Sequence, residues 1–197
     1  MFLPFVPPNS TNMKKWFIGS IVGAILIFAW QGLSWMMLGI HDGAVKYHPA
    51  QDSIMSYLSS TIKEDGAYML PTAKPGTSEK EKQDMMKQME GKPWASIIYH
   101  SSFKSNMTMM MIRGFLVDIF LVMSLIYILT RGGTTPIPRR VFSGSVAFGL
   151  AFFLWGPYTG HVWYDLPWGM IKADLIDALV AWSLCGIWLG WWLNKAK

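Results

Sequence analysis

The chain has 197 residues, of which 52% are apolar and only 15% are charged, against about 25% charged residues in ordinary soluble domains. This composition argues against a soluble globular protein. The net charge of +5 comes mostly from basic residues at the ends of apolar runs, with no basic and aromatic stripe, so nucleic-acid binding is not expected. The single cysteine, Cys185, lies within an apolar run and is expected to be a small buried side chain.

The first predicted membrane span covers residues 16–40, which contain no charged residue. Lys14 and Lys15 precede it, as in a secretory signal, but the apolar run is too long for a cleaved signal and predicts a retained anchor helix. Residues 1–15 are then a cytoplasmic extension. Whether residues 1–12 belong to the genuine protein stays open, because Met13 also suits a start of translation.

Residues 41–107 are predicted to form a small extracytoplasmic α+β unit. Apolar residues at helical spacing indicate a helix over 51–62, and a short extended piece follows over 67–70. Ser78, with Glu81 three residues later, predicts a capped helix over 79–90, and residues 94–99 are expected to be a strand. The unit is too small to hold a core alone, so it needs the membrane, its own helices or a partner.

Three further spans follow, over residues 108–130, 141–158 and 170–193, with a cytoplasmic tail over 194–197. The third is short, and Gly156-Pro157 is expected to end it. The predicted fold class is therefore an all-α integral membrane protein, a four-transmembrane-helix bundle with a small extracytoplasmic α+β loop domain between the first and second helices. Small residues four apart, such as Gly19 and Gly23 or Gly186 and Gly190, suit close helix packing.

Basic residues set the predicted orientation. The termini and the short connection between the second and third spans contain basic residues and no acidic residue. The basic residues are Lys14, Lys15, Arg131, Arg139, Arg140, Lys195 and Lys197. Basic residues in short loops favour the cytoplasmic side. We therefore expect a multi-pass protein of a bacterial inner membrane with both termini in the cytoplasm.

Five polar residues lie within the predicted spans and form a candidate intramembrane cluster: Gln31, Arg113, Asp118, Asp174 and Asp177. Charges at such depth need partners or a purpose. Counting residues from the helix ends places Arg113 level with Asp177, which predicts an ion pair between Arg113 and Asp177 or Asp174. Asp118 is expected to be uncharged or hydrogen bonded, with Gln31 as its partner. An interhelical clasp, a proton or ion pathway, and a lipid or quinone headgroup site are the alternatives.

Histidine and methionine side chains near the outer ends of the spans offer weaker metal candidates. His41, His161, Met107 and Met110 could hold Cu(I), which prefers soft ligands. No zinc or haem spacing is present, so no cofactor is expected.

No catalytic motif is found, and the chain is expected not to be an enzyme. The leading hypothesis is a non-catalytic accessory or structural subunit of a larger membrane complex, such as one of energy transduction, with other membrane-protein subunits and lipids as partners. The alternatives are a small carrier, sensor or lipid- or quinone-binding protein that uses the polar cluster, and a copper-handling membrane protein.

Overall fold

The structure, a computed structural model, describes residues 10–131 and 136–195. The chain separates into two units, one formed by residues 47–105 and the other by the segments before and after them. Parts of the predicted N-terminal extension (1–9), of the connection between the second and third spans (132–135) and of the tail (196–197) lie outside the described residues.

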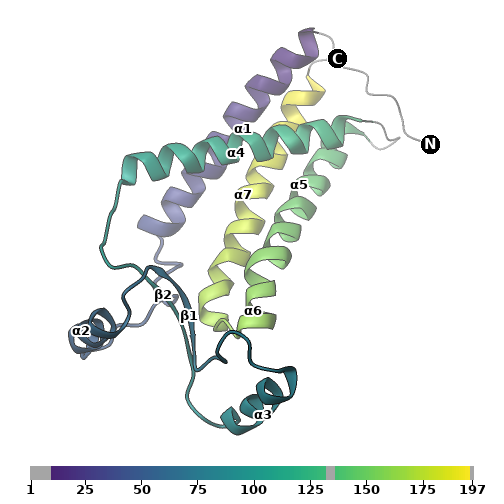
Figure 1. Cartoon of the computed structure of the whole chain (residues 1–197). Coiled ribbons are helices and arrows are strands. Elements are labelled where there is room, and N and C mark those ends of the chain that lie inside the picture. The colour runs from purple at the N-terminus through teal and green to yellow at the C-terminus, as the bar shows by residue number, and fades with distance from the viewer. Residues whose placement is uncertain (1–9, 132–135, 196–197) are drawn as a thin grey trace. The chain divides into compact units, whose positions relative to one another are not determined.

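The larger unit consists of long helices (Figure 1). Its elements are α1 (Ser10–Met36), α4 (Met107–Thr130), α5 (Ile137–Phe153), the π-helix η1 (Leu154–Tyr158), α6 (Thr159–Tyr164) and α7 (Trp168–Asn194). The helix α1 begins at Ser10, so part of the segment predicted as an extension is helical. It ends at Met36, four residues before the predicted end of the first span.

Three helices of the described chain are long and apolar enough to cross a membrane, over Met13–Met36, Met107–Thr130 and Ile137–Tyr164. The described residues are mostly helical and form one small sheet. The helix α7 is as long as α1 but is not among these three. It carries Lys172, Asp174 and Asp177 in its N-terminal half.

The prediction that Gly156-Pro157 ends the third helix was wrong. The chain runs on from α5 through η1 into α6, and the helical stretch ends only at Tyr164, where Asp165 adopts a left-handed conformation with φ 54°. Proline lacks the N–H that an α-helical turn requires. The wider π-turn around Pro157 absorbs this defect, so the helix continues to span length.

At several positions a glycine on one helix allows a neighbouring helix to approach closely. A Cβ atom added at Gly186 of α7 would lie 2.7 Å from Cβ of Ser145 on α5, and one at Gly23 of α1 would lie 2.8 Å from Val122 on α4. The small residues predicted to permit close packing therefore do so. Cys185 is fully buried among these helices, as expected, beside Leu125, Leu189 and other apolar side chains of the core.

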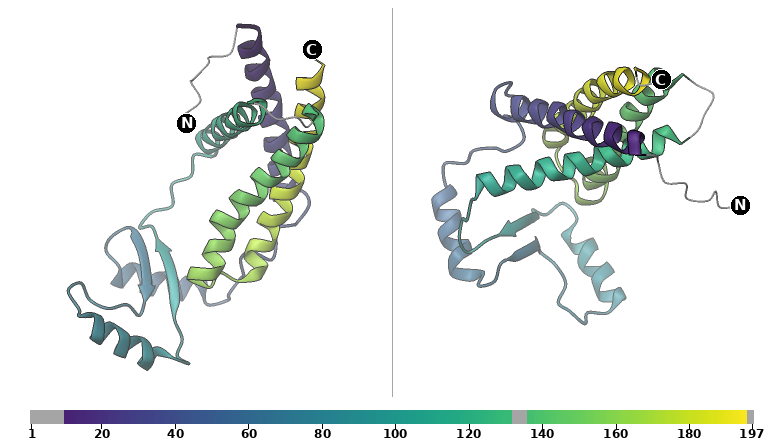
Figure 2. Two further views of the ribbon diagram at one scale, coloured as in Figure 1. Left: turned by 90° about the vertical axis from the view of Figure 1, so that its right-hand side faces the viewer. Right: turned by 90° about the horizontal axis from the view of Figure 1, so that it is seen from above.

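The helices α5 and α7 run side by side along their length, whereas α4 lies steeply across both of them (Figures 1 and 2). Regular four-helix bundles keep their helices within about 20° of parallel. The unit thus departs from a regular bundle at α4. Residues equally far from the ends of α4 and α7 therefore do not lie at the same level.

The smaller unit contains two short helices, α2 (Gln51–Thr61) and α3 (Glu79–Met89), and two strands, β1 (Gly66–Leu70) and β2 (Ala95–Tyr99). The strands pair antiparallel, with Gly66 opposite Tyr99 and Leu70 opposite Ala95. The predicted helix–strand–helix–strand order is confirmed. A hydrogen bond from the Ser101 backbone N–H to Asp65 Oδ1, of 2.8 Å, joins the two ends of the hairpin. This bond holds the pKa of the Asp65 carboxyl below its usual value.

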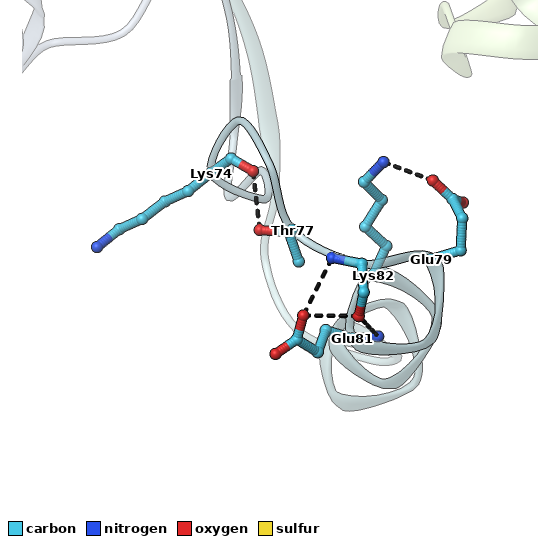
Figure 3. A network of polar contacts seen from close by, with 6 residues as sticks. Lys74, Thr77, Glu79, Glu81 and Lys82 are labelled. Carbon is cyan, nitrogen blue, oxygen red and sulfur yellow. Dashed lines mark hydrogen bonds and ion pairs between the residues drawn. The ribbon is translucent and has the colours of Figure 1, made fainter.

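The predicted capping box at the start of α3 is confirmed. The Glu81 backbone N–H donates to the Ser78 hydroxyl at 3.4 Å, and the Ser78 backbone N–H donates to Glu81 Oε2 at 3.0 Å. Figure 3 shows this network, with the neighbouring ion pair of Lys82 and Glu79. The Ser78 hydroxyl also donates to Glu81 Oε2 at 2.6 Å, and this bond is the main reason that the pKa of the Glu81 carboxyl lies below its usual value.

Candidate functional site

Asp177 of α7 is the acceptor of a polar contact that joins α7 to α1. Trp30 Nε1 donates to Asp177 Oδ1 at 2.9 Å, and the Ser34 hydroxyl donates to the same oxygen at 2.6 Å. His41, in the turn after α1, places Nε2 2.9 Å from Oδ2. An ionised carboxylate only accepts, which assigns the proton to this ring nitrogen. Both carboxylate oxygens are therefore used.

Helical spacing explains why α1 supplies two of these donors. Trp30 and Ser34 are four residues apart and so lie on one face of the helix. The imidazole of His41 is held against that face by stacking on Trp35, with ring centroids 3.9 Å apart. We call this arrangement of Trp30, Ser34, His41 and Asp177 the Asp177 clasp.

The predicted ion pair between Arg113 and the acidic residues of α7 is not formed. Arg113 is exposed, and no ion pair of the described residues joins it to Asp174 or Asp177. The prediction assumed that α4 and α7 run parallel, so that equal residue counts give equal depth. Because α4 crosses α7 steeply, that match does not hold, and the donors of α1 take the place that Arg113 was expected to fill.

Asp118 of α4 is deeply buried, with 6% of its surface exposed. As predicted, the Gln31 side chain lies within hydrogen-bonding reach of this carboxylate. The second carboxylate oxygen, Oδ2, is buried and has no hydrogen-bond partner among the described residues. Such an unsatisfied group is uncommon in folded proteins and calls for an explanation.

Two adjoining pockets bring all five residues of the predicted polar cluster together. The first, of about 560 Å³, lies between α1, α4 and α7 and is lined by Gln31, Trp35, Met110, Asp174, Asp177 and Trp182 among others. The second, of about 390 Å³, is lined by Gln31, Met110, Arg113 and Asp118 among others. We call them the acidic pocket and the arginine pocket. They meet at Gln31 and Met110, which line both.

The two acidic residues of the acidic pocket differ in their contacts. Asp177 is saturated by the clasp, whereas Asp174 is only partly buried and receives no hydrogen bond from the described chain. No basic side chain of the described residues lines the acidic pocket. The pocket thus offers a carboxylate acceptor, with Trp35 and Trp182 also in its lining, and suits a cation with N–H donors.

The weaker metal candidates have separate surroundings. His41 belongs to the clasp, and His161 of α6 places Nδ1 2.6 Å from the backbone oxygen of Leu166. Met110 lines both pockets, and Met107 is exposed at the start of α4. The described residues contain no group of three or more histidine, cysteine or acidic side chains that could hold a metal ion.

Thioethers also gather in the smaller unit. Met69, Met86 and Met89 line a pocket there with Trp94, but lysine side chains line the same pocket. Nearby ammonium groups oppose the binding of a metal cation.

Sequence reasoning found the acidic residues of the site but missed Trp30, Ser34, Trp35 and Trp182. The four-residue spacing of Trp30 and Ser34 was available as a signal, because both can donate a hydrogen bond from one helix face toward a buried acceptor. The chain matches no protein-family model, no curated protein and no solved structure.

Proposed function

We propose that the chain is a non-catalytic accessory or structural subunit of a larger bacterial inner-membrane complex. The observation that carries this proposal is the lack of a core in the smaller unit. Among residues 47–105, all of them described, only Tyr99 is buried, and neither α2 nor α3 buries a side chain. Large apolar side chains are exposed instead, including Phe103 at 94% and Ile98 at 76%. A unit of this size gains stability when another surface covers such side chains.

We further propose four membrane spans with both termini in the cytoplasm, α7 being the fourth. The charges of α7 gather at one end, and its remaining length is apolar. Contacts at the opposite end support an interfacial position there. There Lys195 lies 4.2 Å from the ring centre of Trp191. At the C-terminal end of α4, Arg131 lies 4.2 Å from the ring centre of Tyr127. Aromatic rings beside basic residues are typical of the cytoplasmic membrane surface. In this arrangement α4 is a strongly tilted span.

Cysteine labelling tests the orientation. In a Cys185→Ser background, Ser78→Cys should react with an impermeant thiol reagent added to intact cells. Thr134→Cys should react only after the cells are permeabilised. The opposite pattern would show that the smaller unit faces the cytoplasm and would overturn the topology.

Photo-crosslinking tests the accessory role. A photoreactive phenylalanine analogue at position 103 should form adducts with one or a few membrane proteins in native membranes. The same analogue at Lys80, an exposed position on the charged helix α3, is the matched control and should form few. Adducts with lipid alone at position 103, or equal protein adducts at both positions, would contradict the proposal.

The alternative of a small binding protein, sensor or carrier is favoured by one observation, the convergence of the polar cluster on the two adjoining pockets. The copper-handling alternative gains no such support, because His41 and His161 are each engaged by other groups of the chain.

A further inference from the structure

The junction of the acidic and arginine pockets presents three acceptors without an adequate donor. Asp174 receives no hydrogen bond from the described chain, and Oδ2 of the 94%-buried Asp118 is likewise unpartnered among the described residues. The amide of Gln31, which lines both pockets, lies within reach of Asp118 through its N–H₂ group and keeps its own oxygen as a further acceptor.

A primary ammonium group matches this set. It carries three N–H donors and a positive charge, and it has no acceptor that would conflict with the carboxylates. Trp35 and Trp182 also line the acidic pocket and give it an apolar wall. A quaternary ammonium group has no N–H to donate to Asp118.

The arginine pocket supplies the complementary charge. Arg113 lines it and forms no ion pair with another described residue. A guanidinium group binds phosphate oxygens in a planar, two-pronged geometry. A ligand that carries a phosphate a few atoms from its ammonium would therefore extend from the junction toward Arg113.

We propose that the two pockets bind the headgroup of an aminophospholipid of the ethanolamine type, with its ammonium between Asp174 and Asp118 and its phosphate at Arg113. This site is independent of the accessory role proposed above.

A lipid fits better than a soluble amine because of the residues that border the pockets. The pockets lie on helices of which α1 and α4 are apolar enough to cross a membrane. Trp35, Met110 and Met111 line the acidic pocket and are largely exposed, at 63%, 59% and 45%. These side chains can accompany the acyl chains of a bound lipid out of the pocket, whereas a soluble amine would leave them uncovered.

The test is lipid binding by the purified full-length protein, freed of native lipid and returned to nanodiscs of defined composition. Native mass spectrometry or a spin-labelled lipid measures retention. Phosphatidylethanolamine should bind about ten-fold more tightly than phosphatidylcholine or phosphatidylglycerol, as expected for hydrogen bonds between charged groups. Equal binding of the three lipids would overturn the proposal.

Variants locate the site. Asp174→Asn and Arg113→Gln should each weaken phosphatidylethanolamine binding about ten-fold, and Asp118→Asn should do the same if the variant folds. Asp165→Asn, an acidic position outside both pockets, is the matched control and should bind like the wild type. Unchanged binding in Asp174→Asn and Arg113→Gln would refute the assignment.

Competition with soluble amines distinguishes a lipid headgroup from a soluble amine as the ligand. Phenethylamine and free phosphoethanolamine should compete only weakly with the lipid. If either binds at Asp174 while phosphatidylethanolamine does not, the pocket serves a soluble amine and the proposal is wrong.

Discussion

Removal of the Asp177 carboxylate should destabilise the larger unit through the loss of three contacts at once. Asp177→Ala leaves Trp30 Nε1, the Ser34 hydroxyl and His41 Nε2 without their common acceptor. Polar contacts within membrane proteins contribute about 0.6 kcal/mol each on average, so three contribute about 2 kcal/mol. For a chain of this length, a loss of that size lowers Tm by roughly 4–8 °C.

Two further variants separate hydrogen bonding from the loss of the side chain. Asp177→Asn keeps an oxygen that can accept from Trp30 and Ser34, so about two thirds of the effect should disappear. Asp174→Ala is the matched control. It removes an acidic side chain three residues earlier on the same helix, to which the described chain donates no hydrogen bond.

The assay is thermal unfolding in detergent without added lipid, followed by tryptophan fluorescence and by gel filtration. Ser34→Ala combined with Asp177→Ala should cost less than the sum of the single variants, because both remove the same contact. A Tm for Asp177→Ala within about 1 °C of that for Asp174→Ala, or strict additivity in the double variant, would refute the clasp.

Gly186→Ala should lower Tm, because the new Cβ would lie 2.7 Å from Cβ of Ser145 and overpacking of this kind costs about 1–3 kcal/mol; Gly156→Ala, whose Cβ would meet nothing within 4 Å, should not. Ser78→Ala should speed hydrogen exchange of the first turn of α3 several-fold, because it removes the capping hydroxyl, and unchanged exchange would contradict that role. The folded-state pKa of the Glu81 carboxyl is lowered. Its contribution to the stability of α3 is therefore fully present above the ordinary glutamate pKa, near about pH 4. That contribution is lost as the pH falls through the lowered folded-state pKa. Exchange of α3, corrected for its intrinsic pH dependence, should therefore rise on acidification in the wild type and much less in Ser78→Ala.

The smaller unit could be predicted from sequence because its signals are local. The cap of α3 needs only Ser78 and Glu81, three residues apart, and the hairpin begins where Asp65-Gly66 interrupts the preceding helix. Such signals act through backbone bonds within a few residues, so tertiary packing changes them little. The same reasoning failed at Pro157. The rule that proline ends a helix takes no account of a π-turn, through which the helix continues past Pro157 to Tyr164.

The sequence indicated which residues form the candidate site, but not which of them form hydrogen bonds or ion pairs with one another. Gln31, Asp118, Asp174 and Asp177 could be selected because polar residues are rare within apolar runs. Their partners depend on how each helix is rotated and how the helices cross, and neither quantity is contained in the spacing along one helix. Arg113 shows this plainly, since the crossing of α4 removed the match in depth on which its predicted ion pair depended.

The rotation of α7 about its own axis explains why its two acidic residues have different roles. Three residues turn an α-helix by about 300°, so Asp174 and Asp177 share a broad face but point about 60° apart. The rotation that brings Asp177 onto the donors Trp30 and Ser34 leaves Asp174 directed into the acidic pocket, without a donor from the described chain. The clasp thus fixes the position of the carboxylate of Asp174, which accepts no hydrogen bond from the described chain. A protein that needed Asp174 only for packing would gain from an apolar residue there, because a partly buried carboxylate that accepts no hydrogen bond is costly.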